Sequence, residues 1–186
     1  MAATFLTNQF LIAMPGMADP NFAQTVTLVC EHNAQGALGI VINRQLPMTL
    51  GDVFAQLGLD AAQSKVADSP VLQGGPVQTD RGFVLHTPLE GFESSMPVSD
   101  EIMVTTSRDI LTAIAQGKGP SKYLVALGYA GWGGGQLEGE MRQNAWLAVE
   151  ADSNIVFDMP LPNRFDGALG RLGIKFDRLH LEGGHA

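Results

Sequence analysis

Cys30 and His32 come nearest, in residue type and spacing, to a catalytic pair in this chain. A thiolate nucleophile needs a neighbouring base or positive charge, and residues i and i+2 lie on the same face of an extended strand. The roots of two such side chains are still about 7 Å apart. The pair is compatible with a thiol-dependent hydrolase or a redox protein. The alternative is that an isolated buried cysteine packs as a small hydrophobic residue.

The stretch GYAGWGGGQLEGEM, residues 128–141, could bind phosphate. A glycine-rich loop does so when it leads from a strand into a helix and its free N–H groups face the anion, helped by a lysine or a hydroxyl. This stretch has neither helper, and Glu138 and Glu140 would repel a phosphate. The two carboxylates also make a poor acid and base pair, because residues two apart on a helix point to different sides.

We favour a sharp turn as the interpretation of the same stretch. Its glycines would let the chain leave a buried strand and begin a short helix near Gln136, with Trp132 covering the bend. Glu138 in the first turn would offset unpaired amide N–H groups and the positive end of the helix dipole. At least one of Gly133 and Gly134 should then need a backbone angle that is closed to valine. The remaining interpretation is an edge that binds a partner.

Arg44 and Arg81 are notable in a chain with only 11 Lys and Arg against 19 Asp and Glu. Two arginines could clamp a small anionic ligand, or they could hold loops by pairing with nearby acids. Asn33 at a strand end is typical of a turn, in which its side chain satisfies local backbone groups. The residues that we expect to bind a ligand or a partner are Asn33, Arg44, Arg81, Trp132, Gln136 and Glu138.

The histidines show no metal-ligand spacing, since the chain has no HxxxH or CxxC pair. They are scattered over the sequence at His32, His86, His180 and His185. A site made by His32, His86 and an acid would require folding to bring them together. We therefore expect no metal and no cofactor.

The net charge of −8 argues against direct nucleic-acid binding, which needs clustered Lys and Arg. It is compatible with a protein partner that carries basic patches. The single cysteine cannot form an internal disulfide, and the chain begins without a secretory signal pattern. Its apolar runs are far shorter than the roughly 20 residues of a membrane-spanning helix. We expect a cytoplasmic protein without a membrane segment.

Hydrophobic periodicity and turn residues predict the elements that must position these groups. TVTLVCEH and LGIVIN should form an antiparallel hairpin across the turn NAQG. Thr49 should cap a helix, with Asp52 at the third position after the cap. Strands are expected at 9–14, 25–32, 38–43, 71–77, 81–88, 101–106, 123–132 and 145–151. Helices are expected at 49–58, at 107–117 from Ser107, and at 163–173 capped by Asn163.

The order of these elements, with strands in adjacent runs and few helices between them, favours an α+β fold. We predict one domain, residues 1–186, built on a large mixed, largely antiparallel β-sheet with several short helices. The segment at 123–132 is apolar on both faces, as a central strand would be.

Three blocks resemble the hallmark segments of the YqgE/AlgH family of uncharacterised bacterial proteins. They are FLIAMPGMADPNFAQTVTLVCEHNAQGALGIVINR, LQGGPVQTDRGFVLHTP and GYAGWGGGQLEGEMRQNAWL. The resemblance implies a cytoplasmic protein of about this size with an α+β fold on a large mixed sheet. Some members are named for a proposed regulatory effect on alginate synthesis, and the resemblance implies no catalytic site. The sequence contains no helix-turn-helix with a basic recognition helix.

The sequence as a whole favours a non-enzymatic, regulatory protein that acts through a protein partner or a small anionic ligand. The alternative is a thiol-dependent enzyme or redox protein that uses Cys30 and His32. Thiol reactivity separates the two.

Overall fold

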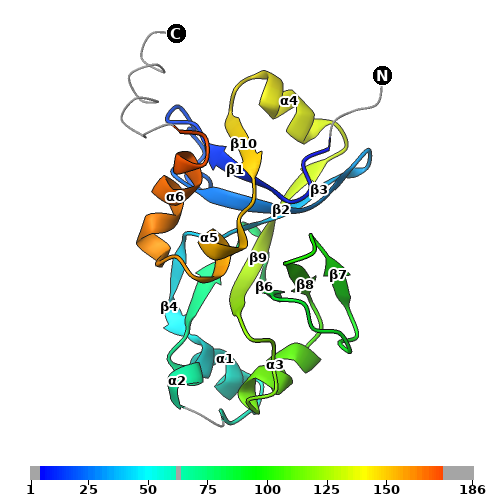
Figure 1. Ribbon diagram of the computed structural model, residues 1–186, viewed down its shortest axis with the longest axis vertical. Coiled ribbons are helices and arrows are strands. Elements are labelled where there is room, and N and C mark those ends of the chain that lie inside the picture. Colours follow the sequence, from blue (N-terminus) through cyan, green and yellow to red (C-terminus); the bar gives the residue numbers. More distant parts are fainter. Residues whose placement is uncertain (1–4, 62–63, 174–186) are drawn as a thin grey trace.

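A computed structural model describes residues 5–61 and 64–173, and these form a single-domain α+β fold around a curled sheet (Figure 1). The strands are β1 (Gln9–Ala13), β2 (Val26–Asn33), β3 (Gly36–Val41), β4 (Gln45–Thr49), β5 (Pro70–Gln73), β6 (Val77–His86), β7 (Ser95–Pro97), β8 (Met103–Thr105), β9 (Tyr123–Gly133) and β10 (Trp146–Glu150). The helices are α1 (Leu50–Gln56), α2 (Ser64–Ala67), α3 (Asp109–Ala115), α4 (Gln136–Arg142), α5 (Ser153–Phe157) and α6 (Arg164–Gly170), with a 3₁₀ turn η1 (Leu161–Asn163).

The sheet follows the order β10-β1-β2-β3-β9-β6-β8-β7, with β4 and β5 joined to it through β9. Every pairing is antiparallel except that of β5 with β9. This confirms the predicted mixed, largely antiparallel sheet. No helix among the residues described is long and apolar enough to cross a membrane.

β9 joins the two halves of the sheet. Its first half, Tyr123–Leu127, pairs with β5 and β6, while Ala130–Gly133 pairs with β3. In Figure 1 it runs from the region of α1 and α3 up to α4. The predicted central strand is therefore confirmed.

Backbone segments cross closely where β9 changes partners. Gly128 has a φ of 79°, and a Cβ added there would lie 2.4 Å from the carbonyl oxygen of Gly75. A Cβ on Gly75 would lie 2.1 Å from the carbonyl carbon of Tyr129. Only glycine permits this approach. Gly74 and Gly75 before β6 and Gly128 in β9 are thus two sides of one backbone contact.

Three apolar clusters fill the fold. The inner face of the curled sheet forms the central cluster, which includes Phe10, Leu28 and Phe83, and α5 and α6 close it. A second cluster packs α1 and α3 on β5, β6 and β9. The third lies under α4 and contains Trp132, Leu137 and Trp146.

The helix termini were predicted with mixed success. Thr49 and Asp52 form the expected capping box, with the Thr49 hydroxyl accepting from the Asp52 amide and the Asp52 carboxylate accepting from the Thr49 amide. The predicted cap of Asn163 is wrong, because its φ of −97° and ψ of −7° are already helical and its side chain makes no capping bond. η1 feeds directly into α6, so the extended backbone that a capping residue needs is missing. α3 begins at Asp109, two residues after the predicted start at Ser107.

Short elements escaped the sequence analysis. β4, β7, α2 and α5 span three to five residues each, too few for a periodic pattern to emerge. β10 was predicted as a strong strand and lies at the edge of the sheet.

We predict that Gly128→Ala lowers the free energy of unfolding by at least about 3 kcal/mol, since a left-handed residue with a Cβ costs about 1–2 kcal/mol before the clash with Gly75 is counted. Urea denaturation followed by circular dichroism measures the change. Gly16→Ala is the matched control, because a Cβ on Gly16 meets no atom within 4 Å. An unchanged midpoint for Gly128→Ala would contradict the close crossing.

Candidate functional site

Five of the residues singled out from the sequence meet at one end of the sheet. The register pairs His32 with Ala37, and Ala37 with Trp132 of β9. Residues that face each other across paired strands share a face of the sheet, so His32 and Trp132 lie on the same side. α4 covers this side with Gln136 and Glu138. We call His32, Trp132, Gln136, Glu138 and Glu140 the α4 cluster.

Both ring nitrogens of His32 are occupied. The amide of Leu6 donates to Nδ1 at 2.9 Å, so in the neutral ring the proton is on Nε2, which donates to Oε1 of Glu138 at 3.1 Å. The His32 side chain is fully buried, and that of Glu138 is 24% exposed. The hydrogen bond from His32 lowers the pKa of Glu138. With no free nitrogen lone pair, His32 cannot act as a general base in this arrangement.

Glu140 holds the two tryptophans of the chain together. Its Oε1 accepts from the indole N–H of Trp132 at 3.1 Å and of Trp146 at 2.9 Å, and its Oε2 accepts from the amide of Gln136 at 3.0 Å. The indole rings meet edge to face, with 6.1 Å between their centroids. Glu138 and Glu140 therefore serve different partners, as expected for residues two apart on a helix. They form no acid and base pair.

The glycine-rich stretch is a turn, as the sequence predicted. β9 ends at Gly133, α4 begins at Gln136, and the Gly133 amide donates to Oε1 of Gln136 at 3.0 Å. The prediction that Gly133 or Gly134 needs a backbone angle closed to valine is wrong, however. Gly135 has the left-handed φ of 78°, whereas Gly133 and Gly134 do not require glycine angles. Trp132 covers the bend and is only 6% exposed.

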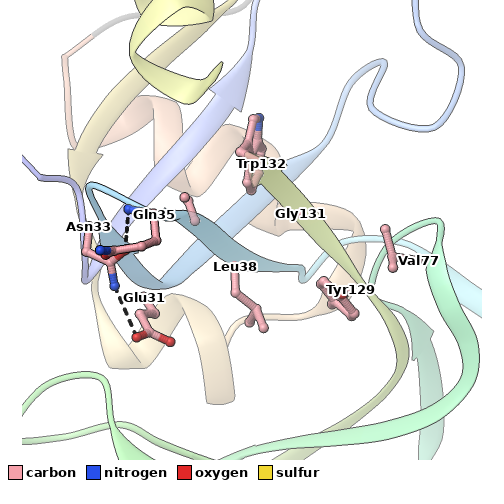
Figure 2. Close-up of a pocket in the computed structure, with 10 residues that line it drawn as sticks. Glu31, Asn33, Gln35, Leu38, Val77, Tyr129, Gly131 and Trp132 are labelled. Atoms are coloured by element: carbon pink, nitrogen blue, oxygen red, sulfur yellow. Dashed lines mark hydrogen bonds between the residues drawn. The ribbon is translucent and has the colours of Figure 1, made fainter. Parts of the chain in front are cut away.

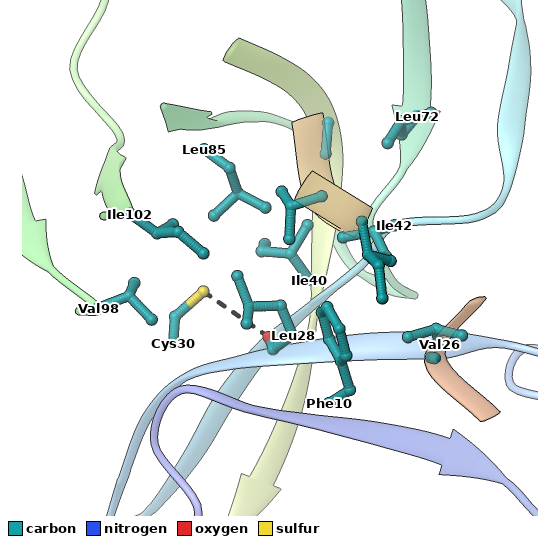
Figure 3. Close-up of a cluster of buried hydrophobic side chains, with 14 of the residues drawn as sticks. Phe10, Val26, Leu28, Cys30, Ile40, Ile42, Leu72, Leu85, Val98 and Ile102 are labelled. Atoms are coloured by element: carbon teal, nitrogen blue, oxygen red, sulfur yellow. Dashed lines mark hydrogen bonds between the residues drawn. The ribbon is translucent and has the colours of Figure 1, made fainter. Parts of the chain in front are cut away.

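Cys30 lies apart from His32. Figure 3 shows its sulfur in the central cluster with Leu28, Val98 and Ile102, where Sγ donates weakly to the Leu28 carbonyl. Burial, with a smaller contribution from the charge of Glu31, raises the pKa of the thiol to about 12. The predicted shared face is wrong, because the register of β2 shifts between Val29 and Glu31 and this bulge reverses the alternation.

The two arginines contact different elements. Arg44 donates to the carbonyls of Asn21 at 2.7 Å and Ala23 at 2.8 Å, and so holds the loop before β2. Arg81 is exposed on β6, bonds to Gln78 and lies over the ring of Phe83 at 5.5 Å. The loop-holding interpretation fits Arg44, although through carbonyls and not through acids.

Asn33 lies on the other face of the hairpin. Its Oδ1 accepts from the Gln35 amide at 2.9 Å, which makes it the turn residue that was predicted, and its amide reaches Glu31 at 3.3 Å. These residues border an open groove of about 510 Å³ (Figure 2). We call it the hairpin groove. Its lining includes Glu31, Asn33, Leu38, Val77, Tyr129 and Gly131.

Sequence reasoning missed Glu31, Leu38, Val77 and Tyr129 as neighbours. The four residues lie on four different strands, β2, β3, β6 and β9. They come together only because the β2–β3 hairpin packs beside the start of β6. No local signal marks this packing. Glu31 lies between the candidate residues Cys30 and His32, and Tyr129 lies in the glycine-rich stretch at 128–141, so both belong to segments that the sequence marks.

His32 and His86 do not come together. His86 faces Tyr123 at the start of β9, while His32 is next to Ala37, which faces Trp132 near its end. Nine residue steps along β9 separate these points, which amounts to at most roughly 30 Å. His86 is buried, bonds to Thr105 at 2.6 Å, and has a pKa lowered by burial. His180 and His185 lie outside the residues described. Within residues 5–61 and 64–173, no cluster of three metal-ligating side chains occurs.

We predict that Glu140→Ala lowers the free energy of unfolding by about 3 kcal/mol, because it leaves two buried indole N–H groups without an acceptor. Urea denaturation followed by tryptophan fluorescence measures this loss. Glu140→Gln, which keeps one acceptor oxygen, should lose less. The exposed Glu150→Ala is the control and should change stability by less than about 0.5 kcal/mol. Equal midpoints for Glu140→Ala and Glu150→Ala would refute the stabilising role of the Glu140 hydrogen bonds to the two tryptophans.

We expect the Cys30 thiol of the folded protein to react with iodoacetamide at pH 8 on the order of a thousandfold more slowly than a free cysteine, because its pKa of about 12 leaves almost no thiolate. Mass spectrometry of the alkylated fraction over time gives the rate. The same protein in denaturant should react at the rate of a free thiol. A native rate profile centred well below the free-thiol pKa of about 8.5 would restore the nucleophile hypothesis, and one centred near 8.5 would contradict the burial of the thiol.

Comparison with known proteins supports the resemblance of the three blocks. The family model described as AlgH-like (DUF179) matches residues 10–177. UPF0301 proteins from Thioalkalivibrio sulfidiphilus and Thiobacillus denitrificans are 54% and 52% identical, covering 100% and 97% of this chain and 99% and 97% of their own length.

Two solved structures share the fold. The solution structure of the AlgH protein from Pseudomonas aeruginosa matches with a TM-score of 0.82 at 50% identity, over 97% of this chain and 95% of that one. A crystal structure of a Corynebacterium diphtheriae protein matches with a TM-score of 0.71 at 17% identity, over 92% and 89%. The second likeness concerns the fold alone. The family model, the full-length relatives and the AlgH structure together establish that this chain belongs to the AlgH-like (UPF0301) family.

Proposed function

We propose that this chain is a non-enzymatic, regulatory binding protein, and that the hairpin groove takes an extended, basic segment of a protein partner. The support begins with the groups that could have done chemistry. His32 uses both ring nitrogens internally, and Cys30 is a buried thiol with a raised pKa. Glu138 and Glu140 hold α4 in place. A site without free reactive groups favours binding over turnover.

The observation that carries the proposal is the open groove beside an unpaired strand edge. β6 pairs with β9 only as far as Val77 and Tyr129. Beyond that point the edge of β9 bordering the groove at Gly131 has no strand neighbour within the part of the chain described. An extended segment can add to such an edge through backbone hydrogen bonds, while pockets beside it select side chains.

The lining sets the chemistry of the partner. Leu38, Val77 and Tyr129 offer an apolar surface, and Glu31 supplies a carboxylate. The chain carries a net charge of −8, which attracts a basic segment over a distance. A small anionic ligand receives less support, because Arg44 is already bound to two carbonyls and Arg81 is on another element. A cytoplasmic location is part of the proposal, and the single cysteine kept as a thiol supports it.

We predict that Glu31→Lys and Leu38→Glu each weaken partner binding by about tenfold or more, since one reverses the groove charge and the other places a charge on its apolar surface. Capture from the lysate of the native bacterium at physiological salt, with mass spectrometry, identifies the partner. Titration of the purified partner then gives the affinities.

Glu90→Lys is the matched control, because Glu90 is exposed and does not line the groove. It should retain the partner. A partner held equally by the wild type and both groove variants would overturn the assignment of the groove. A partner lost equally by Glu90→Lys would show that only the net charge matters.

A further inference from the structure

A second cavity lies between the helices at the other end of the fold. It has a volume of about 260 Å³ and is bounded by α1, α3 and the outer face of β6 and β9. Leu57, Leu111 and Leu127 give it apolar walls, polar side chains such as Thr106 and Ser107 also line it, and it is separate from the hairpin groove. In Figure 1 this region is at the end of the molecule opposite α4. We call it the Gly82 cavity.

Gly82 leaves this space open. It faces Leu127 across the strands, just as Val84 faces Val125, so a side chain at position 82 would point into the cavity. A Cβ built on Gly82 meets no atom within 4 Å, and its φ lies outside the left-handed region. Glycine is therefore not required here by the backbone, in contrast to Gly128. Gly82 is only partly buried, so the space opens to solvent. A concave surface with apolar side chains and a few polar groups is the usual form of a small-molecule site.

Two opposite charges stand at the rim. Asp80 is on β6 and Arg108 directly precedes α3, and both line the cavity. No ion pair joins them among the residues described. A guanidinium has five N–H donors, and Arg108 donates one of them to the carbonyl of Leu57. The rim thus presents a carboxylate and a cation that are both able to take a further partner.

We propose that the Gly82 cavity binds a small zwitterion with an apolar side chain, that is, a free apolar α-amino acid. The side chain occupies the space that Gly82 leaves. The ammonium group pairs with Asp80 and the carboxylate with Arg108. The volume lies just below the roughly 300 Å³ at which drug-sized pockets begin, which suits a ligand of this size. A ligand with one charge would leave the other rim group unmatched and facing a like charge.

The test is a titration of the ¹⁵N-labelled protein with L-phenylalanine, monitored by NMR. Amide signals of the lining residues should shift, and those of the hairpin groove should not. Two matched ligands probe the head group, since phenethylamine lacks the carboxylate and 3-phenylpropionate lacks the ammonium. Each should bind at least about fivefold more weakly than phenylalanine. Equal affinity for all three ligands would overturn the zwitterion assignment. If the amide signals of the lining residues do not shift at millimolar phenylalanine in about tenfold excess over the protein, the site itself is overturned.

Variants assign the contacts. Gly82→Leu should fill the cavity and abolish binding without loss of thermal stability, while Gly16→Leu, also at an open position, should bind normally. Asp80→Asn should weaken phenylalanine and phenethylamine and spare 3-phenylpropionate. Arg108→Gln should do the reverse. Retained binding by a folded Gly82→Leu variant would refute the proposal. Leu38→Glu should bind phenylalanine normally, which separates this site from the partner groove.

Discussion

In the middle of β9, the backbone passes Gly74 and Gly75 so closely that a Cβ on either of them, or on Gly128, would lie within 2.4 Å of main-chain atoms. This contact fixes where β9 leaves β5 and β6 and joins β3. Both halves of the sheet take their relative positions from it. The α4 cluster and the hairpin groove at one end, and the Gly82 cavity at the other, all lie along this one strand.

The residues that look reactive in the sequence are held in structural roles. Glu140 satisfies two indole N–H groups that burial would otherwise leave without partners, and His32 ties the start of the chain, through Leu6, to α4, through Glu138. In a site of low dielectric such charge-assisted bonds are stronger than in water, and a missing partner costs more. Carboxylates and a histidine in one cluster are therefore insufficient evidence of catalysis when the histidine and both carboxylates already hold structural hydrogen bonds.

The glycines of the chain divide by physical cause. Gly74, Gly75 and Gly128 are required by close backbone approach, and Gly135 by the left-handed turn into α4. Gly82 is in neither group, since a side chain there would meet open space. The distinction separates glycines that shape the fold from one that shapes a cavity.

Local patterns in the sequence determined much of this protein. The alternation of polar and apolar residues predicted most strands. Thr49 and Asp52 predicted a capping box, and the glycine-rich stretch predicted the turn into α4. These features depend on contacts within a few residues, which a sequence displays directly. The tertiary structure decided the rest. A one-residue bulge in β2 set Cys30 and His32 on opposite faces, and a preceding 3₁₀ turn removed the cap from Asn163. The hydrogen bonds of Glu140 to two tryptophans depend on the packing of separate elements, and so does the position of Asp80 and Arg108 at one cavity. Register and packing are set by the whole chain, so no local pattern shows these contacts.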